Sequence, residues 1–394
     1  MRMRAAVLEE FGRPLEVQEV ELSEPRAGEV LVRLEACGVC HTDMYTASGA
    51  DPSGYAPAVL GHEGCGIVER TGEGVSLVAE GDRVVTLFSS QCGECEHCLS
   101  PKTNLCMAIR PQQNKGQLPD GTVRLSRAES DAPDSASVRN PESDAPDSAS
   151  VRNPAEPIRH FMGTSTFAEY TVMPEIALAV VSADAPPDRA CVFACGLSTG
   201  LGAAMNTAGV EPGSTCVVFG AGLVGLGAVA GCRLQGAERI VCVDLSAERL
   251  ELARDQGATD TLLGGEGTVE EVLEMTGGMG ADYTFEATGN VDVMRQAVEA
   301  ARMGWGLCTV AGVAGKGETL DIVPRLLITG RRVAGSSFGG LKGRDQVPAL
   351  VERYLQGEID VDALISHQLT LDEVNRGFEL MEAQDGIRSV IVFG

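Results

Sequence analysis

The second half of the chain alternates short apolar strands with amphipathic helices. From about residue 210 the segments TCVVFG, RIVCVD, YTFEATG and GLCTVAGV each have the pattern of a buried strand, and helix-length segments such as SAERLELARDQG separate them. Strands joined through helices lie parallel, because a parallel pair needs a long crossover connection. The sequence therefore predicts an α/β fold, with a doubly wound parallel sheet of the Rossmann type over 197–337.

A glycine-rich turn after the first of these strands predicts a dinucleotide site. Gly220, Gly222 and Gly225 form G-x-G-x-x-G between an apolar strand and a helix, and a second strand ends at Asp244. Glycines here allow a tight turn and let a pyrophosphate approach the helix N-terminus. Asp244 would accept hydrogen bonds from the adenosine ribose and repel a 2′-phosphate, and the two residues after it offer no arginine to receive one. The cofactor expected is NAD.

Four closely spaced cysteines predict a metal lobe at 91–107. The spacing in QCGECEHCLSPKTNLC is C-x2-C-x2-C-x7-C, formed by Cys92, Cys95, Cys98 and Cys106. Ferredoxin-type iron–sulfur runs begin in the same way, but their last cysteine follows after three residues and precedes proline. A disulfide framework is disfavoured because thirteen cysteines is an odd number. A closed structural zinc site fits best.

The first part of the chain has a different pattern. Runs such as EVLVRLEACG, GCGIVERTG and DRVVTLF alternate with Gly and Pro, which predicts an antiparallel, barrel-like β domain.

ESDAPDSASVRNP occurs at 129–141 and again at 142–154, and its composition cannot support a core, so 129–154 is expected to be a dispensable insert. The tail ends in the strand RSVIVFG, which is expected to fold back onto the first domain. The expected domains are 1–196, 197–337 and 338–394.

Composition limits the partners and the location. A net charge of −25 argues against nucleic acid and against an anionic membrane surface as partners. No apolar run is long enough to span a bilayer, and the N-terminus lacks the apolar segment of a signal peptide. Thiols kept reduced beside a zinc site fit the cytoplasm.

Three further segments carry a family resemblance. They are GVCHTD, which contains Cys40, LGHEG, which contains His62, and FACGLSTG, which contains Cys195. With the cysteine lobe and the glycine-rich turn, they resemble the zinc-dependent medium-chain alcohol dehydrogenases. HTDMYTASGADP, FMGTSTFAEYTV and SFGGLKGR narrow the resemblance to class III, the S-(hydroxymethyl)glutathione dehydrogenases. The resemblance implies a GroES-like β-barrel catalytic domain beside the Rossmann domain.

The resemblance also implies a catalytic zinc site, the second zinc of the chain. Cys40, His62 and Cys195 would ligate this zinc and leave its fourth position to water or substrate. Glu63 would lie beside the metal. Asp43 would orient the histidine ligand.

Other residues acquire roles in the same way. Thr42 would take the substrate proton, and His41 and Arg388 would contact the cofactor pyrophosphate. The assembly implied is a homodimer in which the strand near GLCTVAGV pairs with its twin across a two-fold axis.

The substrate end of the resemblance is mixed. Arg110 and Asp51 match residues that bind the glutathione adduct. Four positions depart from the family's glutamine, glutamate, tyrosine and lysine, and these are Met107, Ser53, Phe88 and Asp292. We therefore expect hydride transfer to NAD from the S-hydroxymethyl adduct of a thiol that need not be glutathione. A general primary alcohol dehydrogenase without a thiol requirement is the alternative. A third hypothesis, an NAD-binding relative without chemistry, conflicts with the complete set of zinc ligands.

Overall fold

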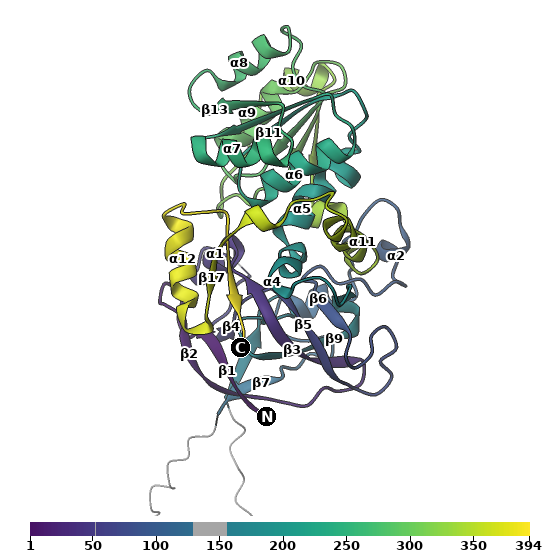
Figure 1. Ribbon diagram of the computed structural model, residues 1–394, viewed down its shortest axis with the longest axis vertical. Helices are drawn as coiled ribbons and strands as arrows, with labels where there is room; N and C mark the ends of the chain where they lie inside the picture. Colours follow the sequence, from purple (N-terminus) through teal and green to yellow (C-terminus); the bar gives the residue numbers. More distant parts are fainter. Residues whose placement is uncertain (52, 129–155) are drawn as a thin grey trace, which may run out of the picture.

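The computed structural model describes residues 1–51, 53–128 and 156–394. Figure 1 shows an upper lobe, which carries a parallel sheet, above a lower lobe built from β-strands, and both chain ends lie in the lower lobe. The two lobes follow from two kinds of sequence pattern, short alternating strands below and strand–helix units above. Their junction is where the site lies.

A small closed barrel forms one part of the lower lobe. Its strands are joined in the order β1-β2-β7-β8-β4. The bounds are β1 (Arg2–Leu8), β2 (Glu16–Leu22), β4 (Ala58–Val59), β7 (Leu125–Arg127) and β8 (Pro157–His160). The predicted insert 129–154 lies outside the described residues, and the chain that flanks it belongs to β7 and β8.

A second sheet completes the lower lobe, in the order β10-β6-β5-β3-β18-β17, with β9 also paired to β3. β18 pairs antiparallel with β3, so the C-terminal segment does return to the first part of the chain, as the sequence predicts. The bounds are β3 (Glu29–Gly38), β5 (Glu63–Thr71), β6 (Arg83–Thr86), β9 (Tyr170–Pro174), β10 (Leu178–Val180), β17 (Ile365–Leu369) and β18 (Arg388–Val392).

The upper lobe is the predicted doubly wound sheet. Its parallel strands run in the order β13-β12-β11-β14-β15-β16 in the described part of the chain, which in order of appearance is 3-2-1-4-5-6. The bounds are β11 (Thr215–Phe219), β12 (Arg239–Asp244), β13 (Asp260–Leu263), β14 (Tyr283–Glu286), β15 (Leu307–Val310) and β16 (Arg332–Gly335).

Alternate residues of the parallel strands pack against helices on opposite faces. Val218 belongs to the cluster that contains Leu250, whereas Val217 belongs to the cluster that contains Val298. Both faces are therefore covered, which explains why the strands are uninterrupted apolar runs. The helices are α6 (Leu223–Leu234), α7 (Ala247–Gln256), α8 (Thr268–Met275), α9 (Val291–Ala300) and α10 (Pro324–Ile328).

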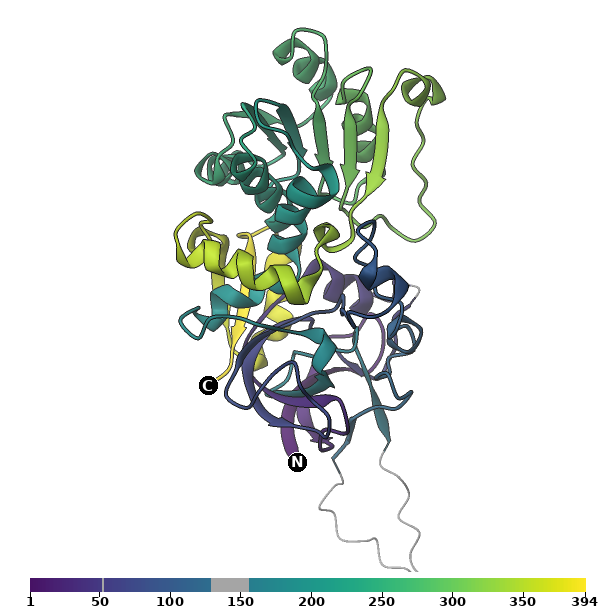
Figure 2. The same ribbon diagram turned by 90° about the vertical axis from the view of Figure 1, so that its right-hand side faces the viewer.

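Helices at the junction join the two lobes into one core. α5 packs along α6, and one buried cluster extends from Leu87 in the lower lobe to Val218 in the upper lobe. Figure 2 shows α11 crossing between the lobes. The remaining helices are α1 (His41–Ala47), α2 (Glu96–Leu99), α3 (Arg110–Gln113), α4 (Pro187–Ala190), α5 (Gly196–Gly202), α11 (Gly343–Leu355) and α12 (Val374–Glu382).

The prediction that the GLCTVAGV strand pairs with its twin in a second subunit is wrong. β15 is the GLCTVAGV strand, and it is hydrogen-bonded to β14 on one side and to β16 on the other. A strand with two partners cannot extend the sheet into a second subunit. The edge strand on this side of the described sheet is β16, which is short and begins at Arg332 directly after Arg331, so no apolar run marks it in the sequence.

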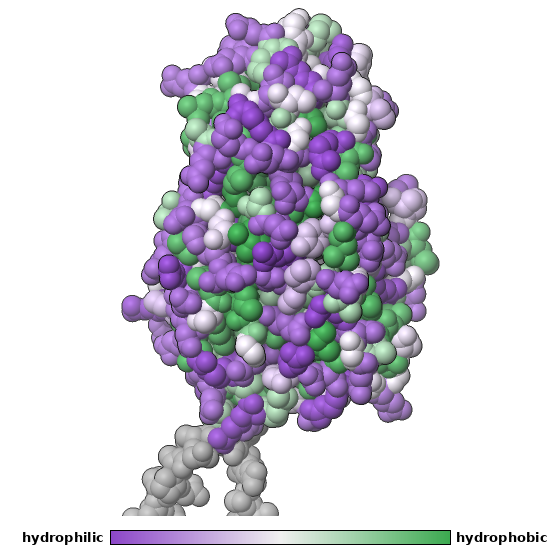
Figure 3. Space-filling model, viewed as in Figure 1, coloured by the Kyte–Doolittle hydropathy of each residue, from purple (hydrophilic) through white to green (hydrophobic). Residues whose placement is uncertain are grey.

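The surface is polar, as the high net charge of the chain suggests. The face in Figure 3 is mainly hydrophilic, with hydrophobic residues in small groups. All thirteen cysteines are free of disulfides. Among the described residues no single helix is long and apolar enough to cross a bilayer; the bent pair Pro187–Ala194 and Gly196–Ala208 meets that test by length and composition alone.

Candidate active site and metal centres

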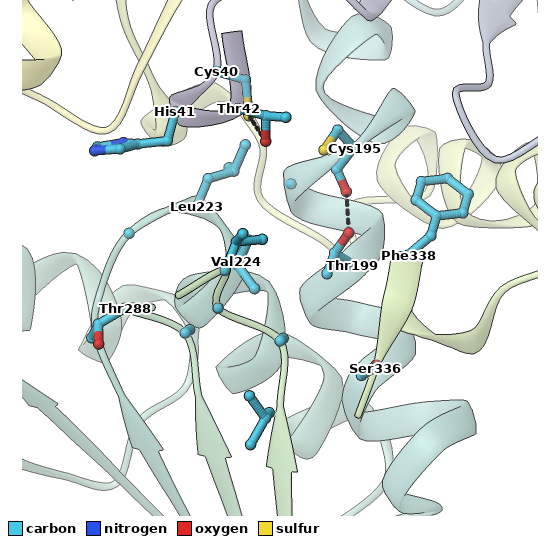
Figure 4. Close-up of a pocket in the computed structure, with 18 of the residues that line it drawn as sticks. Cys40, His41, Thr42, Cys195, Thr199, Leu223, Val224, Thr288, Ser336 and Phe338 are labelled. Atoms are coloured by element: carbon cyan, nitrogen blue, oxygen red, sulfur yellow. Dashed lines mark hydrogen bonds between the residues drawn. The ribbon is translucent and has the colours of Figure 1, made fainter. Parts of the chain in front are cut away.

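A cleft of about 2050 Å³ runs along the junction of the two lobes. Figure 4 shows Cys40, Thr42 and Cys195 on one side of it. Leu223 and Val224, from the N-terminus of α6, face them from the upper lobe. The cleft lies beyond the carboxyl ends of the parallel strands, which is where ligands bind in open α/β sheets.

Three segments far apart in the sequence bring a Cys–His–Glu–Cys cluster together. Cys40 precedes α1, His62 directly precedes β5, Glu63 is the first residue of β5, and Cys195 precedes α5. One ligand atom from each residue lies within 4.8 Å of the others. The His62 Nε2 atom is buried and makes no hydrogen bond to any described residue. Two sulfurs and an open imidazole nitrogen are the donor set of a catalytic zinc site, so the residues fit the metal.

Asp43 fixes the orientation of the histidine. Its carboxylate is fully buried and accepts from His62 Nδ1 at 3.1 Å, from the Gly61 amide at 3.0 Å and from the Cys40 amide at 3.1 Å. An ionised carboxylate only accepts, so the His62 proton lies on Nδ1 and Nε2 presents its lone pair to the cluster. Asp43 thereby positions two members of the cluster at once.

A buried ion pair borders the cluster. Arg388 Nη2 lies 3.3 Å from Glu63 Oε1, and Arg388 Nη1 donates to the Val39 carbonyl. Burial raises the pKa of Glu63 to about 8, against the opposing effect of the arginine. The neighbouring Cys195 sulfur and the Arg388 charge lower the pKa of Cys40, which favours the thiolate that a metal requires. Arg388 also lines the cleft.

The four-cysteine lobe forms a second candidate metal centre, and its sulfurs also lie within 4.8 Å of one another. The start of α11, with the residue that precedes it, holds the lobe in place. Lys342 donates to the Cys98 and Ser100 carbonyls at 2.5 and 3.0 Å, and Arg344 donates to the Gln91 carbonyl at 2.8 Å. The lobe residues Lys102 and Asn104 line the cleft. A closed sulfur site here therefore supports one wall of the cleft.

The glycine-rich turn has the shape that its sequence predicts. Gly220 has a positive φ of 97°, and a Cβ on Gly225 would lie 1.7 Å from the Gly220 carbonyl oxygen. A Cβ on Gly222 would meet nothing within 4 Å, so the space over the helix N-terminus is open. Asp244 accepts from the Ala221 amide at 2.6 Å and from the Ser246 amide at 2.8 Å, and it lines the cleft. The turn fits a pyrophosphate.

The structure places the remaining predicted residues as follows. His41 and Thr42 line the cleft, and the Thr42 Oγ1 atom lies 3.7 Å from the Cys40 sulfur. The Phe88 ring packs edge-on against the His62 ring, with centroids 5.6 Å apart. Arg110 lines the cleft, and its guanidinium makes no hydrogen bond or ion pair with any other described residue.

Two acidic residues that the sequence associates with the substrate, Asp51 and Asp292, do not line the main cleft. Asp51 shapes its own loop, because it accepts from the Thr46 hydroxyl at 2.8 Å and from the Ser53 amide and hydroxyl at 2.8 and 2.7 Å. Asp292 is paired with Arg295, one turn along α9, and does not line the cleft. The charge reversal at residue 292 therefore lies outside the cleft wall.

Sequence reasoning missed Arg249. This residue lines the cleft beside Asp244 and donates to the Gln384 and Gly386 carbonyls at 3.2 and 3.0 Å, which ties α7 to the lower lobe. A basic residue in the first turn of the helix after Asp244 was the available signal. Arg249 lies five residues after Asp244, on the helix and beyond the two residues that follow the strand.

A glycine-rich turn that faces a Cys–His–Glu–Cys cluster across one cleft defines the class: the protein is a zinc-binding dehydrogenase. Two family models match, the alcohol dehydrogenase GroES-like domain over 26–125 and the zinc-binding dehydrogenase over 224–356.

Comparison with known proteins narrows this class. The chain is 47% identical over 391 residues to alcohol dehydrogenase class-3 of Myxine glutinosa, a match that covers 98% of this chain and 97% of the other. It is 45% identical to S-(hydroxymethyl)glutathione dehydrogenase of Paracoccus denitrificans, over 100% of both chains. The chain belongs to the class III alcohol dehydrogenases.

Solved structures agree on the fold. An alcohol dehydrogenase zinc-binding domain protein from Burkholderia ambifaria superposes with a TM-score of 0.88 at 31% identity, covering 100% of this chain and 99% of the other. Benzyl alcohol dehydrogenase from Acinetobacter calcoaceticus gives 0.86 at 30% identity, over 100% of both chains.

Proposed function

We propose that the protein oxidises the S-hydroxymethyl adduct of a low-molecular-weight thiol with NAD. Formaldehyde and the thiol RSH add to give RSCH₂OH, and the enzyme converts RSCH₂OH and NAD⁺ to RSCHO, NADH and a proton. The observation that carries this proposal is the Cys40, His62 and Cys195 cluster in the same cleft as the glycine-rich turn. The names of the full-length relatives support the thiol adduct as the substrate class.

Two zinc ions per chain are part of the proposal. Cys40, His62 and Cys195 would hold one ion, and the four-cysteine lobe would hold the other. The catalytic zinc would supply Lewis-acid chemistry that lowers the pKa of a substrate hydroxyl. NAD would supply the hydride acceptor, with its pyrophosphate at the glycine-rich turn and near His41 and Arg388.

The chain's own residues handle the proton and exclude water. The Thr42 hydroxyl, beside the Cys40 sulfur, would accept the proton of the substrate hydroxyl and pass it on. Asp43 keeps His62 in the tautomer that binds metal. Phe88 and Phe338, whose ring centroids lie 5.2 Å apart, cover this end of the cleft and limit the entry of water.

The alternative is a primary alcohol dehydrogenase with no thiol requirement, which the structural likeness to a benzyl alcohol dehydrogenase favours. The experiment that separates the two uses purified enzyme with NAD. Formaldehyde is supplied with glutathione, with other small thiols and with no thiol, beside a long-chain primary alcohol. NADH formation that depends on a thiol supports the adduct. Equal rates with and without thiol, or turnover of the alcohol alone, would establish the alternative.

Asp244 is expected to set the preference for NAD. Asp244→Asn removes the charge and keeps the size of the side chain, with one oxygen left to accept from either the Ala221 or the Ser246 amide, which now donate to different carboxylate oxygens. Loss of the repulsion, and of one charge-assisted bond to ribose, should narrow the preference for NAD over NADP by about 10–100-fold. The measurement is kcat/KM for both cofactors. A native enzyme that uses both equally well would contradict the role of Asp244.

Arg110 tests whether the substrate is anionic. Its unpaired guanidinium would bind a carboxylate far from the reacting carbon. Arg110→Ala should lower the selectivity for an anionic adduct over neutral long-chain alcohols by about 10–100-fold in kcat/KM, because one charge-assisted contact is lost. Arg13→Ala, at an exposed arginine outside the cleft, is the matched control. An equal effect on both substrate classes would favour the plain alcohol dehydrogenase.

We also propose a homodimer in the cytoplasm, joined through β16. This edge strand and its surroundings expose apolar side chains, and an unpaired edge is a template for pairing with a second copy. The exposed residues are Trp305, Val323, Leu327, Ile328 and Val333. Trp305 is the only tryptophan of the chain, so its fluorescence reports on this surface. Light scattering should give twice the mass of the chain, and Ile328→Asp should shift it towards the monomer. A wild-type monomer would contradict the dimer.

A further inference from the structure

A buried carboxyl group lies beneath the cleft at the end of β14. Glu286 is the last residue of that strand, and it is fully buried. It does not line the cleft, but the two residues that follow it, Ala287 and Thr288, do. Burying a carboxyl group is unfavourable unless hydrogen bonds compensate it, so a residue that only filled this space would be apolar. What Glu286 contributes must therefore lie in the contacts that it makes.

One oxygen of Glu286 holds the turn after β14. Oε1 accepts from the Thr288 amide at 2.6 Å, from the Thr288 hydroxyl at 2.5 Å and from the Gly289 amide at 2.8 Å. The Thr288 hydroxyl oxygen in turn accepts from the Asn290 amide at 3.1 Å. Hydrogen bonds to a carboxylate are stronger than those to a neutral acceptor, and here three donors converge on one atom. The turn is therefore fixed by a side chain that lies below it.

The same residue joins this turn to the turn after β15. The Glu286 carbonyl accepts from the Ala311 and Gly312 amides at 2.9 and 3.1 Å. The second carboxyl oxygen, Oε2, is buried and has no hydrogen-bond partner among the described residues. A Cβ on Gly312 would lie 2.6 Å from this Oε2 atom and 2.2 Å from the Gly289 nitrogen, so the two turns approach each other without a side chain between them. Glu286 therefore lies at the junction of both turns.

Thr288 connects Glu286 to the glycine-rich turn. Figure 4 shows Thr288 on the upper-lobe side of the cleft. A Cβ on Gly220 would lie 2.8 Å from the Thr288 Cγ2 atom, so the threonine methyl group lies against Gly220. Because Glu286 holds the hydroxyl group of the same side chain, the methyl group has one orientation. The turns that follow β11, β14 and β15 are thus set relative to one another.

The turns after β14 and β15 border the half of the cofactor site that Asp244 does not. In a doubly wound sheet the two halves of a dinucleotide bind on opposite sides of the central strand, which is β11 here. Asp244 ends β12, on one side of β11, whereas β14 and β15 lie on the other side. Adenosine at Asp244 would therefore place the nicotinamide riboside half over Thr288 and Gly312, which both line the cleft.

We propose that Glu286 is a positioning residue for the nicotinamide half of NAD. It acts through Thr288, because it does not itself line the cleft. It holds the turn after β14 against its two neighbours, so that the surface under the nicotinamide riboside is formed before the cofactor binds. This inference rests on the proposed function, in which NAD is the hydride acceptor. A preformed surface lowers the cost of ordering both partners, so loss of the carboxylate should weaken the binding of this half alone.

The test compares NADH with 5′-AMP, which lacks the nicotinamide half. Dissociation constants of both ligands are measured by titration calorimetry on the full-length, zinc-loaded protein. Glu286→Gln keeps the size of the side chain but replaces the carboxylate by a neutral amide. Thr288→Val is the second variant, because it keeps a methyl group against Gly220 and removes the hydroxyl group that Glu286 holds.

Thr284→Val is the matched control. Thr284 lies on the same strand, is fully buried and donates to the Ala297 carbonyl at 2.7 Å, and neither residue lines the cleft. The control therefore removes a buried hydrogen bond of β14 that does not reach the turns. Melting temperature is measured for all three variants, and Thr288→Val decides the test if Glu286→Gln does not fold.

Glu286→Gln should raise the dissociation constant of NADH by about 5–20-fold, the value of one charge-assisted hydrogen bond, and leave that of 5′-AMP within about two-fold of the wild type. Thr288→Val should have a smaller effect in the same direction. The control should keep the ratio of the two constants even where it lowers the melting temperature. An equal rise for both ligands would show that Glu286 only supports the lobe, and that result, or no rise for NADH, overturns the inference. A wild-type protein that binds neither ligand would instead refute the proposed use of NAD.

Discussion

His62→Ala is expected to abolish turnover and to leave the fold intact. The variant removes the imidazole whose free Nε2 faces the Cys40 and Cys195 sulfurs, so the site can no longer hold its zinc. A Lewis acid at a reacting oxygen contributes several kcal/mol, and each 1.36 kcal/mol is a factor of ten, so the loss in kcat should reach about 10³-fold or more. The measurements are steady-state kinetics, zinc content by elemental analysis and circular dichroism.

Two companion variants separate catalysis from stability. Asp43→Asn keeps the shape of the residue that holds His62 but removes its charge, and it should cost about 10–100-fold in activity or metal affinity. His367→Ala, at a partly exposed histidine outside the cleft, should keep full turnover and both zinc ions. A His62→Ala enzyme that retained two zinc equivalents and near-normal turnover would contradict the assignment of the catalytic site.

The parts of the fold that repeat along the sequence were predictable. The alternation of strands and helices from β11 to β15 predicted a parallel sheet with helices on both faces. Apolar residues recur with different periods in strands and in helices, and each strand–helix unit is contiguous in the sequence. The turn at Gly220 was predictable for the same reason, since its motif lies within one strand–helix unit. β16 was not recognised, because RVAG is short and its first residue, Arg332, follows another arginine, so no apolar run marks the strand.

The site was predictable only where a motif carries its own chemistry. The four cysteines of the lobe lie within fifteen residues of sequence, so their spacing alone indicated a metal. Cys40, His62 and Cys195 were found through the family resemblance, since each alone is an ordinary buried residue.

Cys98→Ala is expected to unfold or aggregate the protein, and the cause should be loss of the lobe's zinc. Cys98 contributes one of the four sulfurs, and its carbonyl accepts from Lys342 just before α11. Metal binding at a structural site is coupled to folding, with apparent free energies of about 10–16 kcal/mol in zinc-finger peptides, and that is of the same order as the whole stability of a domain. Without the metal, three remaining thiols have no common partner and the lobe loses its shape.

The damage should extend beyond the lobe. Hydrogen bonds join the lobe to the segment that carries Phe338, which lines the cleft. Lys342 and Arg344 donate to lobe carbonyls, and Asn104 donates to the Ser337 carbonyl. Loss of the lobe should therefore lower the melting temperature and weaken cofactor binding together. Cys308→Ala, at a buried cysteine of β15 remote from both clusters, loses only packing and should cost about 1 kcal/mol with both zinc ions retained. A folded, stable Cys98→Ala protein that still binds two zinc equivalents would show that the lobe is not a metal site.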